Sequence, residues 1–113
     1  MHELSIVMSI IDIAEGEARK AEASAITEIE LEIGQFSGVE KDALDFAIEA
    51  GKKGTMLEEA EWVVHHIRGE AVCSECGTQF NPDELFSPCP SCGSPFHEWR
   101  KGKELRVKSI KVN

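Results

Sequence analysis

Four cysteines, arranged as two identical pairs, are the residues of this sequence best suited to hold a metal ion. Each pair encloses two residues, and twelve residues (77–88) separate the pairs; the cysteines are Cys73, Cys76, Cys89 and Cys92. Because this spacing lets both sulfurs of a pair approach one ion from a tight turn, the four thiolates can form a closed tetrahedral shell. A glycine follows each pair, at Gly77 and Gly93, where we expect the chain to curl under the metal and a side chain to clash.

Three chemistries compete for these cysteines. A pair of disulfides would not require the doubled spacing, and a reducing cytosol disfavours it. A tetrathiolate iron centre for electron transfer is the second alternative, because Cys89-Pro-Ser-Cys92-Gly also resembles half of a rubredoxin site. Ligand type and spacing favour the third, a structural Zn(II) ion. A closed shell leaves no open position for water, and the sequence lacks a phosphate loop or a nucleophile elbow, so we predict that the protein is not an enzyme.

The amino terminus, Met1-His2-Glu3, is a second candidate metal site. The terminal amine, the amide of His2 and its imidazole can form two fused chelate rings once the amide is deprotonated, and the Glu3 amide or another donor can complete a square plane. A planar nitrogen set suits Ni(II) or Cu(II) and does not suit zinc. A histidine at position 2 is common by chance, so the alternative is a chain terminus without metal function.

The other histidines are weaker candidates. His65 and His66 are neighbours in a predicted strand, so they point to opposite faces and cannot share one ion. His97 could reach the four-cysteine site, but we expect it to be a surface residue of the cysteine-containing module.

Apolar periodicity predicts the elements that position these sites. Residues 4–18 form a helix with a core-facing stripe of Leu4, Val7, Met8, Ile11, Ala14 and Ala18. Ile29, Leu31 and Ile33 then alternate with Glu28, Glu30 and Glu32, which predicts a strand with one buried face and one solvated, acidic face. A second amphipathic helix begins at Glu40 and ends near Gly51 and Gly54.

Two further strands are predicted at residues 61–68 and 105–112. The apolar positions of the last strand change parity, and a bulge near Lys108 and Ser109 would reconcile them. Since the cysteines lie before this last strand, we predict an α+β fold in which two helices pack on a three-stranded sheet and a four-cysteine zinc ribbon is inserted. Residues 1–69 and 100–113 would form a nickel-binding body, and residues 70–99 the zinc-binding ribbon. The sequence does not predict the strand order.

Charge and hydropathy narrow the class of protein. The formal net charge is −9, and no lysine or arginine lies between Glu70 and Glu98, so binding to nucleic acid is disfavoured. No apolar run approaches the roughly 20 residues of a membrane span, and the start lacks a basic leader. We therefore expect a cytoplasmic protein that does not bind a membrane.

The sequence resembles the HypA family of hydrogenase maturation factors, called HybF in some members. The resemblance covers the whole length and depends on the opening Met1-His2-Glu3-Leu4-Ser5, the strand ending Ile29–Gly34 and the two cysteine pairs. It implies a nickel metallochaperone that holds Ni(II) as transient cargo on the Met1 amine, His2 and the Glu3 backbone, with Glu40 as a further candidate. It also implies structural Zn(II) on the four cysteines.

The implied partners are a HypB-type GTPase and the [NiFe]-hydrogenase large-subunit precursor, and a homodimer is left open. Some family members have histidines directly beside the ribbon cysteines, where they influence zinc coordination, and this sequence has none there. Two other functions are alternatives: an iron-tetrathiolate electron-transfer protein, and a zinc-ribbon scaffold for protein interactions.

Overall fold

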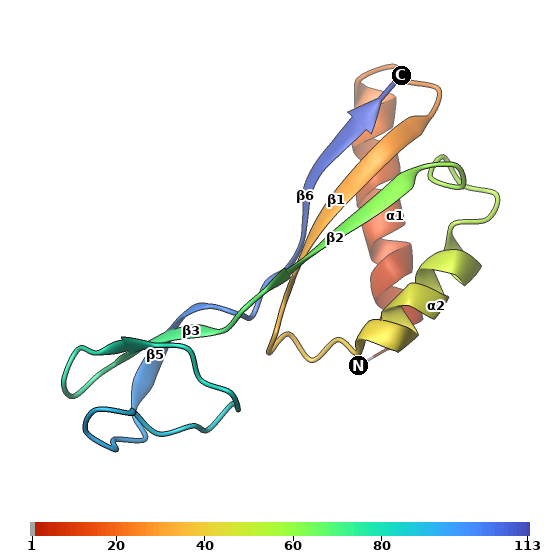
Figure 1. Ribbon diagram of the computed structural model, residues 1–113. Helices are drawn as coiled ribbons and strands as arrows, with labels where there is room; N and C mark the ends of the chain where they lie inside the picture. The colour runs from red at the N-terminus through yellow and green to blue at the C-terminus, as the bar shows by residue number, and fades with distance from the viewer. Residues whose placement is uncertain (1) are drawn as a thin grey trace. The chain divides into compact units, whose positions relative to one another are not determined.

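The computed structural model describes residues 2–113, which form two helices and six strands (Figure 1). In chain order they are α1 (Glu3–Lys20), β1 (Ile26–Gly34), α2 (Lys41–Gly51), β2 (Glu61–Ile67), β3 (Glu70–Cys73), β4 (Gln79–Phe80), β5 (His97–Lys101) and β6 (Leu105–Val112). The chain divides into two compact units. The first contains residues up to 32, 38–65 and 106–113, and the second contains residues 33–37 and 66–105. Within residues 2–113, no helix is long and apolar enough to cross a membrane.

The first unit contains a three-stranded sheet in the order β2-β1-β6, with α1 lying along it (Figure 1). The central strand β1 provides the largest part of the buried sheet surface, since Ile26, Ile29 and Leu31 are almost completely buried. Leu44 and Ile48 of α2 are also buried. The predicted α+β fold, with two helices, a three-stranded sheet and an inserted four-cysteine module, is confirmed.

The buried stripe of α1 differs from the predicted one at two positions. Ile10 is buried, whereas Leu4 and Met8 are 53% and 45% exposed, so these two residues are not core residues as we expected. Leu4, Val7 and Met8 all lie near the contact between α1 and α2, and Val7 is the nearest to Gly51. A Cβ atom added at Gly51 of α2 would lie 3.0 Å from Cγ1 of Val7, 3.6 Å from Sδ of Met8 and 3.7 Å from Cδ1 of Leu4, so Leu4 and Met8 touch α2 with one side and stay exposed on the other.

The acidic face of β1 also differs from the prediction, because it is paired and only half exposed. Glu28 pairs with Lys111 at 3.0 Å and Glu32 with Arg106, both on β6. Glu30 lies between them and accepts a hydrogen bond from the Ser109 hydroxyl at 2.6 Å. Opposite groups on the neighbouring strands β1 and β6 thus form a row of pairs, and the three glutamates are half-buried beneath their partners.

These pairs also show how the side chains of β6 alternate between the two faces of the sheet. Arg106 and Ser109 both reach the glutamate face although their positions are three apart, an odd step that would place them on opposite faces of a regular strand, so the alternation changes between them. The half-buried Val107 and Ile110 show the same three-residue step on the other face. The change of phase agrees with the predicted parity slip, and the bulge itself stays a prediction.

The second unit contains a small three-stranded sheet, β4-β3-β5, which the sequence analysis did not predict. The central Ala71 is fully buried and pairs with Phe80 on one side and Trp99 on the other. The Trp99 ring lies 5.0 Å from the Phe36 ring between centroids. Glycine permits this packing, since a Cβ atom at Gly69 would lie 2.4 Å from Cε2 of Phe36. The second unit therefore has an aromatic core of its own.

Candidate functional site

The four cysteines lie on two turns with matching hydrogen bonds. In the first turn, the Cys73 N–H donates to the Thr78 carbonyl at 2.9 Å and the Gly77 N–H donates to the Cys73 carbonyl at 3.0 Å. In the second, the Cys89 N–H donates to Ser94 at 2.9 Å and the Gly93 N–H to Cys89 at 2.8 Å. The repeated spacing of the sequence therefore folds into two equivalent turns.

The glycines that close these turns are required for a reason other than the predicted one. A Cβ atom at Gly77 or Gly93 would meet nothing within 4 Å, so the expected clash is wrong. Both glycines have φ of +77°, a left-handed conformation that side chains rarely adopt. The backbone conformation of the turn, and not the space beneath the metal, requires glycine.

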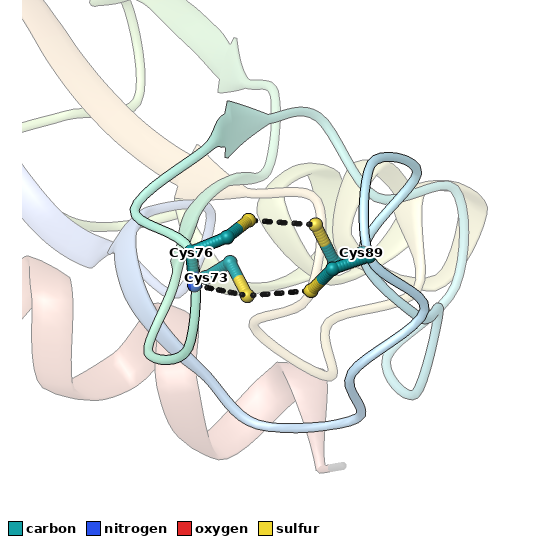
Figure 2. A group of neighbouring side chains, drawn as sticks. Cys73, Cys76 and Cys89 are labelled. Atoms are coloured by element: carbon teal, nitrogen blue, oxygen red, sulfur yellow. Dashed lines mark hydrogen bonds between the residues drawn. The ribbon is translucent and has the colours of Figure 1, made fainter.

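The sulfur atoms of the two turns come together as a tetrathiolate site (Figure 2). All four lie within 4.8 Å of one another; Cys73 and Cys92 are 3.6 Å apart, and Cys76 and Cys89 are 3.7 Å apart. A tetrahedron with Zn–S bonds of about 2.3 Å has edges of about 3.8 Å. All four cysteines are unbridged, so the disulfide alternative is wrong. The site fits a structural zinc ion.

Neighbouring groups shift the pKa values of the Cys73, Cys76 and Cys92 thiols. The backbone N–H of Cys76 donates to the Cys73 sulfur and lowers the pKa of that thiol. The Thr78 hydroxyl, 3.1 Å from the Cys76 sulfur, lowers the pKa of Cys76 to about 6. A hydrogen bond from the backbone of Ser94 lowers the pKa of Cys92. The neighbouring thiol of Cys73, and after it burial and the other two thiols, outweigh this effect and raise the pKa of Cys92 to about 12. Because several adjacent thiolates repel one another, a metal dication is needed to hold all four deprotonated.

At the amino terminus, His2 is an exposed residue that immediately precedes α1, and Met1 lies outside the described residues. Glu3 begins the helix, and its carboxylate accepts a hydrogen bond from the backbone N–H of Glu40 at 3.1 Å. This bond lowers the pKa of the Glu3 carboxyl group. The start of α1 is therefore joined to the start of α2, although the two residues are far apart in sequence.

Glu40 has a clear structural role as the N-cap of α2. Its backbone is extended, and its two carboxylate oxygens accept hydrogen bonds from the N–H groups of Asp42 at 3.2 Å and Ala43 at 2.7 Å. A side-chain acceptor at this position satisfies amides that have no partner within the helix. The carboxylate suggested as a nickel ligand is thus already engaged, and metal binding by Glu40 stays a prediction.

The remaining histidines occupy different environments. Nε2 of His65 lies 3.0 Å from the Glu30 carboxylate, and His66 is exposed. His97 is half-buried: its ring lies edge-on to Phe80 and Trp99, at centroid distances of 5.7 and 5.1 Å. Its Nδ1 atom is buried, with no hydrogen-bond partner among residues 2–113.

Comparison with known proteins identifies the family of the chain. Residues 1–112 match a family model described as "Hydrogenase/urease nickel incorporation, metallochaperone, hypA". The chain belongs to this HypA family. The resemblance seen in the sequence is confirmed, and the family assignment favours a nickel metallochaperone over an electron-transfer protein.

Individual relatives span the full length of the chain. The Hydrogenase maturation factor HypA of Parabacteroides distasonis is 52% identical and the one of Prosthecochloris aestuarii 42% identical; the matches cover 99% and 97% of this chain, and 97% of each relative. Among solved structures, the Ni metallochaperone HypA from Helicobacter pylori is 28% identical, with a TM-score of 0.70 over 99% of this chain and 97% of that one. Both the four-cysteine module and the helical unit lie within these matches.

Proposed function

We propose that this protein binds Ni(II) at its amino terminus as transient cargo and delivers it during maturation of [NiFe]-hydrogenase. The observation that supports the site is the exposed His2 directly before α1, in a chain that matches the HypA family from residue 1. The proposed ligands are the Met1 amine, the His2 imidazole and amide, and the Glu3 amide, a nitrogen set that suits nickel.

The helix start affects the charge balance of this site. The first N–H groups of α1 give its terminus a partial positive charge, which opposes a bound cation. Deprotonation of the His2 and Glu3 amides would cancel the two charges of Ni(II), and the first-turn carboxylate of Glu3 adds negative charge. An exposed terminal chelate can also exchange its ligands without unfolding the protein, which suits delivery better than storage.

Zinc has a different role in this proposal. Cys73, Cys76, Cys89 and Cys92 would hold it, and the metal would supply a cross-link between two turns that no disulfide joins. We assign nickel to the body (residues 1–69 and 100–113) and zinc to the ribbon (residues 70–99). Neither metal performs a catalytic step, so the protein acts as a binding protein and not as an enzyme.

The proposed partners are a HypB-type GTPase and the [NiFe]-hydrogenase large-subunit precursor, in the cytoplasm, with neither nucleic acid nor membrane involved. Homodimer formation is a separate question that light scattering of the zinc-loaded protein answers. The sequence also suggested an interaction scaffold, which would require no nickel site at the amino terminus.

The experiment that tests the proposal is calorimetric nickel titration of four proteins in parallel: native, extended by a few residues ahead of Met1, His2→Ala and His66→Ala. The extension converts the terminal amine to a peptide nitrogen and breaks the fused-ring chelate. We expect the extended protein and His2→Ala to lose tight nickel binding, and the exposed His66→Ala control to keep it. Unchanged nickel binding in the extended protein would move nickel to another site and leave the scaffold as the better explanation.

A further inference from the structure

The second unit has an apolar hollow that neither metal site uses. Its volume is about 400 Å³, and aromatic and aliphatic side chains form most of its wall: Leu85, Phe86, Pro95, Phe96, His97 and Trp99. Phe86 and Phe96 are 87% and 64% exposed. Exposed apolar side chains grouped around a depression usually mark a binding surface, whereas isolated ones do not.

The floor of this hollow is held in place by packing within the second unit. The Trp99 ring lies against Phe36 on one side and meets the edge of His97 on another. Both His97 and Trp99 belong to β5, which lies at the edge of the sheet β4-β3-β5. An edge strand offers backbone N–H and C=O groups to an extended chain laid beside it.

Charge indicates what kind of chain would bind there. Among residues 2–113, Lys103 is the only charged residue that lines the hollow, and its ammonium group lies 5.3 Å from the centroid of the Trp99 ring. A neighbouring depression shares Trp99 and Lys103 and adds Arg100, Lys101 and Glu104. The Glu104 carboxylate accepts a hydrogen bond from the Gly102 N–H at 2.7 Å. A basic rim thus adjoins the apolar hollow, on a protein of net charge −9.

We infer that this hollow docks an acidic, extended peptide segment of another protein, with an apolar side chain inserted beside Trp99 and a carboxylate at Lys103. A concave surface with one basic side suits a side-chain anchor followed by an acidic residue. An anionic bilayer fits less well, because a broad surface of headgroups would also meet the exposed carboxylates Asp83 and Glu84, which come just before Phe86, whereas a short peptide can place its carboxylate at Lys103 alone. The inference does not depend on nickel binding at the amino terminus.

Binding of fluorescein-labelled short peptides to the zinc-loaded full-length protein, followed by fluorescence anisotropy, tests this inference. One peptide has a central Leu-Phe pair flanked by Asp and Glu, the second has the same pair flanked by Lys and Arg, and the third has Ser-Ser flanked by Asp and Glu. We expect only the first to bind, with an affinity that falls as salt rises.

Matched variants locate the binding. Phe96→Ser and Lys103→Glu should each weaken binding of the first peptide by about tenfold or more, which is about 1.4 kcal/mol. Phe46→Ser and Lys53→Glu, which change an exposed phenylalanine and an exposed lysine of the first unit, should leave it unchanged. Zinc content and far-UV circular dichroism establish that each variant is folded.

Several results would overturn the inference. These are absence of binding by the acidic apolar peptide, equal binding of the basic peptide, or equal loss in the first-unit variants. Binding to phosphatidylglycerol vesicles that Phe86→Ser abolishes, without peptide binding, would instead assign the hollow to a membrane surface.

Discussion

Replacement of Glu40 separates its observed role as a helix cap from its suggested role as a nickel ligand. In Glu40→Ala, two hydrogen bonds to the amides of Asp42 and Ala43 are lost. Loss of an N-cap costs about 1 kcal/mol, and loss of a negative charge at a helix start adds about 0.3–1 kcal/mol. We therefore expect the free energy of unfolding to fall by about 1–2 kcal/mol.

The assay is thermal unfolding of the zinc-loaded protein without nickel. For a protein of this size, a loss of 1 kcal/mol lowers Tm by about 4–8 °C, so Glu40→Ala should unfold at least about 4 °C below the native protein. Glu40→Ser is the matched variant, because a serine hydroxyl can cap the same amides while the carboxylate is removed. It should recover most of the lost stability.

Nickel titration of the two variants then decides between the roles. If Glu40 acts only as a cap, Glu40→Ser binds nickel with native stoichiometry and affinity. A stable Glu40→Ser protein that loses nickel affinity would show that the carboxylate is a ligand. A Glu40→Ala protein as stable as the native one would refute the capping argument itself.

Three other predictions concern the rest of the molecule. Cys76→Ser should abolish stoichiometric zinc binding and disorder the second unit while α1 and α2 stay folded; metal analysis and far-UV circular dichroism check this, and collapse of the whole protein would contradict it. Gly16→Ala should raise the free energy of unfolding by about 0.5–1 kcal/mol in urea titrations, because a Cβ atom there meets nothing within 4 Å and alanine favours the helix; no gain would count against this. Glu30→Gln should destabilise the protein at neutral pH but not in strong acid. The Ser109 hydroxyl, and then His65, lower the pKa of Glu30, so its contribution is present above the ordinary value of 4.5 and is lost as pH falls through the lowered value; a stability difference that does not depend on pH, measured by urea unfolding, would contradict this.

Local patterns were sufficient for the helices, the main strands and the four-cysteine site. The turns around Cys73 and Cys89 are closed by hydrogen bonds between residues at most five positions apart, so the spacing of the residues determines them. The alternation of Ile29 and Leu31 with glutamates likewise gives the buried face of β1 directly, because strand geometry has a period of two.

The incorrect expectations came from contacts between distant segments. Leu4 and Met8 have the right helical spacing for the core, but how much of each side chain α2 covers near Gly51 depends on helix packing and not on spacing. Glu40 is not a typical capping residue, so its role could not be read from residue type alone. The short strands β3 and β5 were missed because four or five residues of mixed polarity do not give a clear period.

By itself, then, the sequence determined the metal chemistry available to the protein, because a tight turn brings together ligands that are close in the chain. Only the tertiary structure decided that Glu3 contacts Glu40, that the glutamates of β1 pair with β6, and that Trp99 packs on Phe36 beside an apolar hollow. The physical reason is that each of these contacts joins residues more than thirty positions apart, and their meeting depends on strand order and helix packing, which local periodicity does not encode.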